Sequence, residues 1–534
     1  MRATCHLRSA LTLNAFLIAG LLPAPAAAQC SQARLVTDVF PNEASAYLSD
    51  LATEGDLVAV ARKGNAAHGV VTVHQRQGTD WVQIQVLEHP TVGLDMLSGD
   101  LEMAGGWLAI GNVNQASVVL FEWTPTGFES RGVLHGDPAA LSFGESVALN
   151  PQGTRLAVGS AHVDVGGVDR AGEVVVFDRV GSTWIEVDRL HMSPLEEVSG
   201  FGHSVAVDGD LIAVGAYGAN PGIKGMVQVF RDTGGGSFQV EARVRADDSV
   251  ASPSSGFGWA LELEGNRLAV SAPFTGLHSA RVYLYQWSGT EWLPEHSFAN
   301  GIGTEFGKSI DLSGDLLVVG EHNTSMEAKL GGALHLYRRD PSGWNHTTSM
   351  AAPDVTPGLH FGQRVAIAGE RVLVSGISLP AQNVGGAYAI DNAWTCPATP
   401  LGNQVCVAPT PNSSGQAATL EAYGSLTPSH DLLGLRSHQL PVDQAGLLIA
   451  SLTPGNSPMG QGTLCLGGAF ARVRVEQTDA LGRLHFRMPL DAVPTPPQSQ
   501  PILGGQTWYF QCVYRDQNPL PTFNFSPALE LMFQ

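Results

Sequence analysis

Apolar residues recur along this chain in short, partly alternating runs that are rich in β-branched and aromatic side chains and are separated by turn residues. Runs of this kind are typical of β-strands rather than amphipathic helices. One of them, FGHSVAV at 201–207, has close relatives elsewhere: FGESVAL at 143–149, FGWALEL at 257–263, FGKSIDL at 306–312 and FGQRVAI at 361–367. The pattern predicts an all-β protein built from repeats.

The repeats have a common internal order. Successive copies start 58, 56, 49 and 55 residues apart, and each continues with a tight turn, a second apolar run such as LIAVGA, a variable loop and two further runs. Two degenerate copies, starting at Tyr47 and Leu97, precede the clear ones and bring the number of units to seven. Repeats of about 50 residues with four strands each indicate a β-propeller, because one sheet buries both faces only when neighbours pack around a ring.

The motif resembles a known family. The Phe-Gly opening, with the later Gly-Ala-Pro-like endings VGAY (214–217) and VSAP (270–273), is similar to the FG-GAP repeats of integrin α-subunit propellers and of many exported bacterial proteins. The resemblance extends over about residues 30–395 and implies a seven-bladed β-propeller with adhesive or ligand-binding roles. Many such repeats hold calcium in an Asp/Asn-rich turn, but here the turn is as short as Asp208-Gly209-Asp210, so no calcium site and no cofactor are predicted.

The Phe-Gly pair is the feature that recurs most clearly. It is found at Phe143-Gly144, Phe201-Gly202, Phe257-Gly258, Phe306-Gly307 and Phe361-Gly362. We expect the phenylalanine to wedge between blades and the glycine to allow a close backbone approach or an unusual dihedral angle. Ser204 follows the pair as a nucleophile would follow a hydrolase turn, but no helix pattern comes after it. Other repeats place Ser146, Ala260, Ser309 and Arg364 there, so the sequence predicts no catalytic serine.

The ring needs an N-terminal strand to close it. The last unit has only three runs, and SQARLVTDVF at 31–40 aligns with the missing fourth, so it is predicted to be the outer strand of the last blade. This pairing would bring Cys30 near Cys396, where a disulfide would staple the closure; the alternative is that Cys30 lies on a frayed terminus. The pairing of Cys406, Cys465 and Cys512 stays open.

Both ends of the chain differ from the repeats. Residues 1–28 carry Arg2 and Arg8, an apolar run and a small-residue end, which predict a secretory signal peptide rather than a buried helix. The protein is therefore expected outside the cell or at its surface, where disulfides are permitted. Residues 396–415 predict a linker, and 416–534 a second, sandwich-like β domain similar to C-terminal modules of large secreted bacterial proteins that have no assigned activity.

Net charge narrows the choice of partner. The chain has 29 Lys and Arg residues against 49 Asp and Glu residues, a formal charge of -20. Such a charge argues against nucleic acid and anionic membrane surfaces as partners. After residue 28 no apolar run is long enough to span a membrane.

Loop lengths predict which face of the ring binds a partner. In a four-stranded blade, the loops between strands two and three and from strand four to the next blade share one face, and here they are the long ones. That face carries the acidic candidates Asp164, Asp169, Glu196, Glu197, Asp247, Asp248 and Asp354. They either attract a cation or a basic partner or simply keep the loops hydrated.

No motif in the chain specifies chemistry. There is no H-E-x-x-H, phosphate-binding loop or dinucleotide fingerprint, and the pair His162 and Asp164 is too little for a metal site. No catalytic or metal-ligating residue is therefore predicted. The favoured hypothesis is an exported, non-catalytic binding or adhesion protein that recognises an extracellular protein or glycan, with its oligomeric state open.

The alternative is a propeller hydrolase or lyase acting on extracellular polysaccharide. Convergent charged side chains with perturbed pKa values in the central channel would favour the enzyme. A channel lined by small apolar residues would favour the binding protein.

Overall fold

The computed structural model describes residues 32–34, 47–63, 69–78, 80–90, 99–137, 142–219, 225–246, 256–274, 280–300, 304–324, 331–352, 359–376, 386–391, 393, 401–406, 410–424, 426, 428, 433–478, 482–488, 490–494, 499–517 and 521–533. These residues form strands and turns, with a single short 3-10 helix, η1 (Val113–Gln115). Within them, no helix is long and apolar enough to cross a bilayer. The predicted signal peptide (1–28), Cys30 and Cys396 lie outside the described residues.

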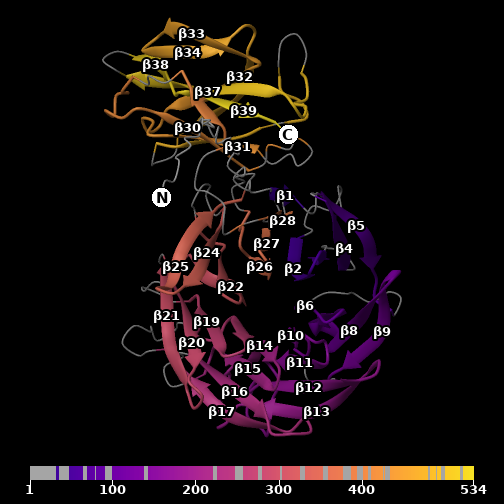
Figure 1. Ribbon diagram of the computed structural model, residues 1–534. Coiled ribbons are helices and arrows are strands. Elements are labelled where there is room, and N and C mark those ends of the chain that lie inside the picture. The colour runs from indigo at the N-terminus through magenta and orange to yellow at the C-terminus, as the bar shows by residue number, and fades with distance from the viewer. Residues whose placement is uncertain are drawn as a thin grey trace, which may run out of the picture.

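Seven four-stranded antiparallel sheets, called blades 1 to 7, are arranged around an axis (Figure 1). Blade 1 consists of β2 (Tyr47–Glu54), β3 (Leu57–Lys63), β4 (Val70–Gln77) and β5 (Asp80–Leu87). Blade 2 consists of β6 (Leu101–Ala104), β7 (Trp107–Asn112), β8 (Ser117–Thr124) and β9 (Gly127–His135). Blade 3 consists of β10 (Ser146–Leu149), β11 (Arg155–Ser160), β12 (Glu173–Val180) and β13 (Thr183–His191).

The other four blades repeat the same order from the axis outwards. Blade 4 consists of β14 (Phe201–Asp208), β15 (Leu211–Ala216), β16 (Met226–Asp232) and β17 (Phe238–Val244). Blade 5 consists of β18 (Leu261–Glu264), β19 (Arg267–Ala272), β20 (Ala280–Trp287) and β21 (Trp292–Asn300). Blade 6 consists of β22 (Phe306–Ser313), β23 (Leu316–Glu321), β24 (Ala333–Asp340) and β25 (Gly343–Met350). Blade 7 consists of β26 (Arg364–Ala368), β27 (Arg371–Gly376), β28 (Gly386–Ile390) and β1 (Gln32–Arg34).

The blades form a closed ring. Each inner strand packs against the next in the order β2, β6, β10, β14, β18, β22 and β26, and β26 packs against β2. The outermost strand of blade 7 is β1, which pairs antiparallel with β28 from Gln32↔Ile390 to Arg34↔Tyr388. The first described strand of the chain therefore completes the last blade, at the place where the sequence predicts it. The all-β propeller predicted from the repeats is confirmed.

The Phe-Gly pairs do what the repeat pattern predicts. The five phenylalanine rings are at most 1% exposed, and Phe201 packs between Val174 of blade 3 and Val214 of blade 4. The five glycines have φ between 86° and 92°, a conformation that L side chains rarely adopt. A Cβ atom on Gly202 would also lie 2.6 Å from the carbonyl oxygen of Glu173 in blade 3.

Ser204 helps to join two blades. Its hydroxyl donates a hydrogen bond to the carbonyl oxygen of Gly258 in blade 5, at 2.8 Å. The same bond joins Ser146 to Gly202 and Ser309 to Gly362. In this position the serine hydroxyl links neighbouring blades.

Three arginines form a second, longer contact between blades. Arg155, Arg267 and Arg371 begin the second strands of blades 3, 5 and 7. Each guanidinium donates to the carbonyl oxygen of a turn glycine in the next blade, lies near an aromatic ring of that blade and pairs with an acidic side chain there. We call this contact the arginine clamp. The clamp of blade 7 reaches blade 1 and so supports the closure.

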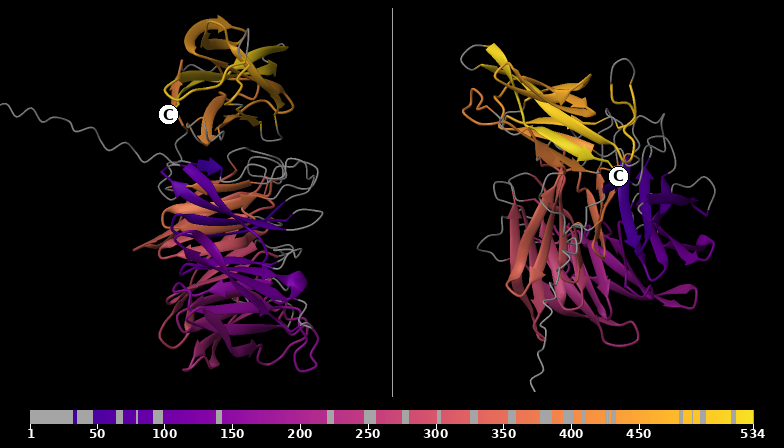
Figure 2. Two further views of the ribbon diagram at one scale, coloured as in Figure 1. Left: turned by 90° about the vertical axis from the view of Figure 1, so that its right-hand side faces the viewer. Right: turned by 45° about the horizontal axis from the view of Figure 1, so that its top comes forward.

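The C-terminal strands form separate sheets beyond the ring (Figure 2). One sheet contains β29 (Asn403–Val405), β39 (Ala528–Met532), β37 (Thr507–Gln517), β32 (Ala445–Ser451), β35 (Ala471–Gln477) and β38 (Pro521–Phe525). Two smaller sheets contain β30 (Thr419–Gly424), β31 (Leu433–His438) and β36 (Leu484–Arg487), and β33 (Thr453–Met459) with β34 (Gly462–Gly467). Side chains of the first two sheets, including Leu435 and Phe510, share one buried cluster.

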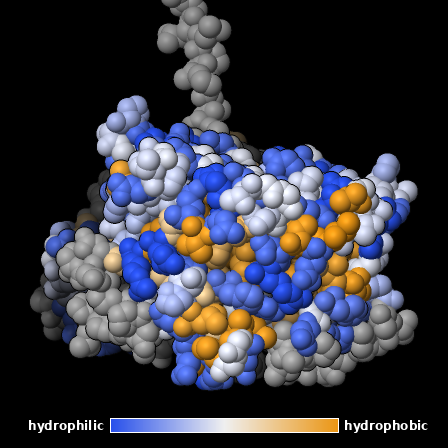
Figure 3. All heavy atoms as spheres, turned by 90° about the horizontal axis from the view of Figure 1, so that it is seen from below, coloured by the Kyte–Doolittle hydropathy of each residue, from blue (hydrophilic) through white to orange (hydrophobic). Residues whose placement is uncertain are grey.

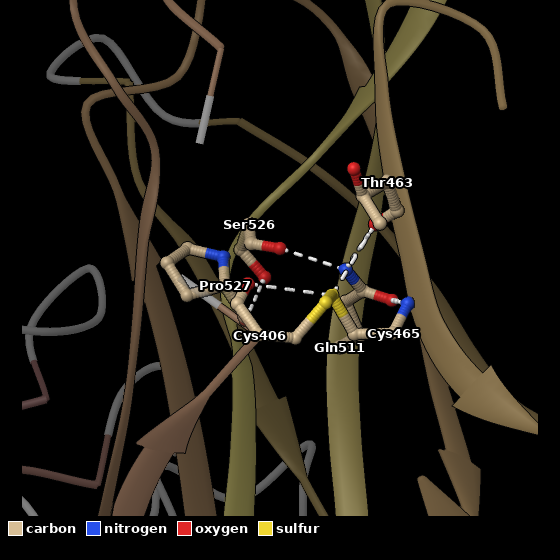
Figure 4. The surroundings of a disulfide bond; sticks show 6 residues. All are labelled: Cys406, Thr463, Cys465, Gln511, Ser526 and Pro527. Atoms are coloured by element: carbon tan, nitrogen blue, oxygen red, sulfur yellow. Dashed lines mark hydrogen bonds between the residues drawn. A yellow bond between two sulfur atoms is a disulfide. The ribbon is translucent and has the colours of Figure 1, made fainter. Parts of the chain in front are cut away.

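A disulfide between Cys406 and Cys465 lies in this part of the chain (Figure 4). Beside it, the Gln511 side chain accepts a hydrogen bond from the Cys465 amide and donates to the carbonyl oxygens of Thr463 and Ser526. Cys512 is a buried free thiol, and burial raises its pKa to about 12. The pairing that the sequence leaves open is thus Cys406 with Cys465.

Candidate functional site: the central channel and its mouth

The seven inner strands surround a cavity of about 680 Å³ on the axis of the ring. This volume is within the usual range of small-ligand sites. By comparison, the outer wall of the ring mixes hydrophilic and hydrophobic patches on the side shown in Figure 3. The channel is therefore the place to look for a concave binding site.

The mouth of the channel is built from the residue that follows each Phe-Gly pair. In blades 3 to 6 these residues are Glu145, His203, Trp259 and Lys308, which we call the mouth arc, and all four line the cavity. The Glu145 carboxylate lies 2.9 Å from Nδ1 of His203, the ring centroids of His203 and Trp259 are 4.2 Å apart, and Nζ of Lys308 is 4.2 Å from the Trp259 centroid. Four successive blades thus supply one continuous set of contacts.

Loops on the same face support the mouth arc from outside. Tyr217, which follows β15, packs 4.7 Å from His203, and Phe274, which follows β19, packs 4.6 Å from Trp259, between ring centroids. Glu305 pairs with Lys308 at 3.2 Å. Since β15 and β19 lead into the long loops, the mouth opens on the face that the loop lengths predict to bind.

Burial and paired charges alter the titration of these groups. Burial lowers the pKa of Lys308, against the opposing charge of Glu305. Burial also lowers the pKa of His322, which lies 3.6 Å from Glu305, to about 4, so this imidazole is neutral at pH 7. Although burial opposes it, hydrogen bonds and charge from His203 and His162 hold the pKa of Glu145 below its usual range. The mouth therefore contains groups held by close pairing: Glu145 with His203, and Lys308 with Glu305.

Just inside the mouth lies a group of one arginine and two aspartates. Nε of Arg364 in blade 7 donates to the Asp50 carboxylate in blade 1 at 3.0 Å. The other oxygen of Asp50 accepts from the Leu101 amide of blade 2 at 2.9 Å. Burial, and the charge and hydrogen bond of Asp50, raise the pKa of Asp100 well above its usual range.

Deeper in the channel, Glu102, Glu262 and Asp311 occupy one level of blades 2, 5 and 6. Asp311 accepts a hydrogen bond from the Ile367 amide at 2.6 Å, whereas the structure records no bond for the carboxyl groups of Glu102 and Glu262 among the described residues. Burial raises the pKa of Glu102 to about 8, with further contributions from Asp311, Asp50 and Glu54. Burial and the neighbouring carboxylates also raise the pKa of Glu262 well above its usual range.

The channel is neither purely apolar nor fully charged. At the level of Glu102, the other four blades supply alanine: Ala52, Ala148, Ala206 and Ala366. Carboxyl groups with raised pKa values, the feature that the hydrolase or lyase alternative requires, do converge there. Among the described residues, however, no group of His, Cys, Asp and Glu side chains is arranged to hold a metal ion.

The acidic loop residues predicted from the sequence do not line the cavity where the structure describes them. Asp164 accepts a hydrogen bond from the Arg170 amide at 2.8 Å, and Asp169 pairs with the Arg170 guanidinium at 3.4 Å. Glu196 is half-buried and Glu197 exposed, on a neighbouring loop joined to Asp169 through the Val198 amide. Asp247, Asp248 and Asp354 lie outside the described residues.

Sequence reasoning missed the mouth arc. The signal was present in the repeats, because the position after each Phe-Gly pair holds Glu, His, Trp, Lys and Gln in turn while its neighbours stay nearly constant. A position that changes among polar and aromatic residues within a constant motif is one that packing does not constrain, and it can therefore face a ligand.

Together these features define a β-propeller whose blades interlock through a repeated Phe-Gly pair and whose axis carries a ligand-sized cavity. Residues 184–230 match the family model described as the FG-GAP repeat. This match places an FG-GAP repeat across blades 3 and 4, within a chain whose sheets form a β-propeller.

Comparisons with solved structures find distant similarities. No curated protein matches the chain. A protein from Lactobacillus plantarum is 15% identical over 58% of this chain and 85% of its own, with a TM-score of 0.41. A putative 6-phosphogluconolactonase from Bacteroides uniformis (13% identity, 59% and 88% coverage, TM-score 0.42) and the WD40 domain of Toxoplasma gondii coronin (12%, 69% and 87%, 0.43) are similarly distant.

Proposed function

We propose that this protein is an exported, non-catalytic binding protein that holds the end of an extracellular glycan in the mouth of its channel. The mouth arc carries the proposal, because four consecutive blades direct Glu145, His203, Trp259 and Lys308 to one opening. The disulfide between Cys406 and Cys465 and the absence of a membrane-spanning helix among the described residues are compatible with a location outside the cell.

A glycan fits this opening better than a protein surface. Protein interfaces are broad, whereas the mouth leads into a concave channel cavity of about 680 Å³ that accommodates a narrow chain end. Its lining combines aromatic rings with paired ionic groups, which offer apolar contact and directional hydrogen bonds to a polyhydroxylated ring. The ion pairs also fix the positions of these groups before any ligand arrives.

Binding rather than catalysis is favoured by how the channel groups are used. Ser204 is engaged with Gly258, and Asp50 and Asp311 accept hydrogen bonds from backbone amides of the next blade. These groups join neighbouring blades, which gives each of them a structural role that needs no catalysis.

The test is a glycan array followed by calorimetry on the full secreted chain, with and without calcium. Trp259→Ala should weaken the binding of any captured glycan at least tenfold, because it removes the ring that links His203 to Lys308. Trp287→Ala is the matched control, since Trp287 packs against Trp292 at the outer strands of the same blade and should leave affinity unchanged. Equal affinities for the two variants, or no glycan bound in any condition, would contradict the proposal.

The second candidate is a hydrolase or lyase acting on extracellular polysaccharide. Glu102 favours it, because a carboxyl group with a pKa of about 8 is protonated at neutral pH and has the character of a general acid. New reducing ends released from polysaccharide by the wild-type protein, and not by Glu102→Gln, would support this candidate over the first. Intact polysaccharide after prolonged incubation would remove it.

A further inference from the structure

We propose that the glycan carries a carboxylate, and that the side chains of Arg364, Lys308 and Gln363 hold this carboxylate at one side of the mouth. This inference rests on the proposed function and names the chemical class of its ligand: an acidic, uronate-type saccharide. The three residues belong to neighbouring blades 6 and 7, and all three line the cavity.

Arg364 stands out among the residues at its level in the channel. All six other blades place aspartate, serine or alanine there, and its side chain is 35% exposed. Asp50 uses only Nε, and among the described residues no hydrogen bond is recorded for the two Nη groups. Asp50 is itself fixed by the Leu51 and Leu101 amides, so it orients the guanidinium without covering it. A guanidinium with free Nη groups is suited to two parallel hydrogen bonds with a carboxylate.

Lys308 adds a second positive charge on the neighbouring blade. Its ammonium lies between Glu305 at 3.2 Å and the rings of Trp259 and Phe274, at 4.2 and 4.9 Å from their centroids. Arg364 is close enough for its charge to contribute to the lowered pKa of both Lys308 and His322. Two half-buried cations that repel one another gain stability when an anion binds between them. Gln363 precedes Arg364 and occupies in blade 7 the repeat position that Lys308 has in blade 6. Its side-chain amide offers a further hydrogen-bond donor.

The rest of the channel favours a sugar acid over a more highly charged anion. Asp311 lies one level deeper than Arg364, and its pKa of about 6 leaves it largely ionised at neutral pH, so it would repel a phosphate dianion more strongly than a carboxylate monoanion. Glu102 and Glu262, with their raised pKa values, offer protonated carboxyl groups that donate to or accept from hydroxyls. A single carboxylate on a hydroxylated ring matches both parts of this lining.

The experiment is calorimetric titration of the full secreted chain with three oligosaccharides of equal length: an oligogalacturonate, its neutral galactose counterpart and a sulfated galactose oligomer. We expect the oligogalacturonate to bind at least tenfold more tightly than the other two. Arg364→Lys, which keeps the positive charge beside Asp50 but removes the planar fork, should abolish most of this preference. Lys308→Met should reduce it severalfold.

Arg338→Lys is the control, because Arg338 pairs with the exposed Glu370 away from the cavity and should leave the preference unchanged. Thermal melts of all variants confirm that they are folded. Tighter binding of the sulfated or neutral oligomer, or an unchanged preference in Arg364→Lys, would overturn the inference. If neutral glycans bind and Trp259→Ala abolishes their binding, the proposed function stands while the acidic ligand does not.

Discussion

Phe201 and Ser204 belong to one motif but contribute very different amounts to the free energy of unfolding. The Phe201 ring is fully buried between blades 3 and 4, so removing it leaves a cavity that rigid strands cannot fill. Ser204 is half-buried and contributes one hydrogen bond, to the carbonyl oxygen of Gly258. The energetic weight of the motif therefore lies in its aromatic residue.

Phe201→Ala should lower the free energy of unfolding by about 3 to 5 kcal/mol, because it combines lost burial with a new cavity. Ser204→Ala should lower it by only about 1 kcal/mol, the usual net value of one hydrogen bond, and should leave ligand binding intact. Urea denaturation followed by tryptophan fluorescence measures both changes. An activity that disappears in Ser204→Ala while the fold persists would restore a nucleophilic role for this serine.

A second residue-scale prediction concerns Glu102 and pH. Burial raises its pKa from 4.5 to about 8, so the folded protein holds this proton more tightly than the unfolded chain does. Glu102 therefore costs little below pH 4.5, and its cost grows as the pH rises from there to about 8. Glu102→Gln should increase stability by about 2 to 4 kcal/mol at pH 8 and by almost nothing at pH 4. Denaturation curves at the two pH values measure this difference, and an equal gain at both would contradict it.

In four of the seven blades, a glycine on the second strand marks a very close approach to the next blade. In β15, a Cβ on Gly215 would lie 2.2 Å from the carbonyl oxygen of Gly258, the same oxygen that Ser204 binds. Gly159 and Gly320 face Gly202 and Gly362 in the same way, each 2.0 Å from the oxygen. The glycine on the second strand of these blades therefore packs against the glycine of the Phe-Gly pair in the next blade.

Gly215→Ala should cost about 3 kcal/mol, since the methyl group forces blades 4 and 5 apart at their most rigid point. Gly209→Ala is its matched control: Gly209 has φ of +58° but nothing within 4 Å of the place that a Cβ atom would take, so only the left-handed backbone opposes the change, at about 1 to 2 kcal/mol. Thermal unfolding compares the two variants. A cost of Gly215→Ala no larger than that of Gly209→Ala would contradict the view that contact between blades 4 and 5 excludes a side chain at this position.

At the scale of strands, the sequence was sufficient to predict the structure wherever the apolar pattern repeated. FGHSVAV and its relatives predicted the inner strands, and the deficit of one run in the last repeat predicted that residues near 31–40 complete it, where β1 now pairs with β28. These inferences use the alternation of side chains along a strand and the spacing of the repeats, and both can be read from the sequence without knowing any side-chain contact.

The candidate site was much less predictable from the sequence. The acidic loop residues were selected by charge and loop length alone, and Asp164 and Asp169 are occupied by Arg170. The mouth arc depends on which residues of different repeats converge on the axis. Glu145 and His203, for example, are in contact although their positions in the sequence differ by 58. Likewise, the pKa of Glu102 depends on Asp311 and Asp50, which the sequence gives no means of placing nearby.

At the scale of the whole ring, one interface differs from the other six. The chain joins blades 7 and 1 only through β1, which precedes β2 in the sequence and is held to β28 by backbone pairing. Noncovalent contacts must therefore hold the other three strands of blade 7 to blade 1. Arg371 bonds to Asp391 at 2.7 Å within blade 7 and to the Gly55 carbonyl oxygen at 3.3 Å in blade 1, and Arg76 of blade 1 reaches Asp391 at 3.1 Å. Arg364 with Asp50 adds a further pair across the same interface.

The arginine clamps allow this closure to be tested against an equivalent interface. Arg371→Met and Arg155→Met remove the same kind of clamp, and each should lower the free energy of unfolding by about 1.5 to 3 kcal/mol, because each removes charged hydrogen bonds to a partly buried carboxylate. Their local effects should differ, since blades 3 and 4 stay tethered by the chain after the clamp is lost. In hydrogen exchange, Arg371→Met should speed exchange in β2, β3, β27 and β28, whereas Arg155→Met should do so modestly in β11 and β14. If both variants loosen only the strands beside the lost arginine and to the same degree, the closure is held by other contacts, such as the pairing of β1 with β28.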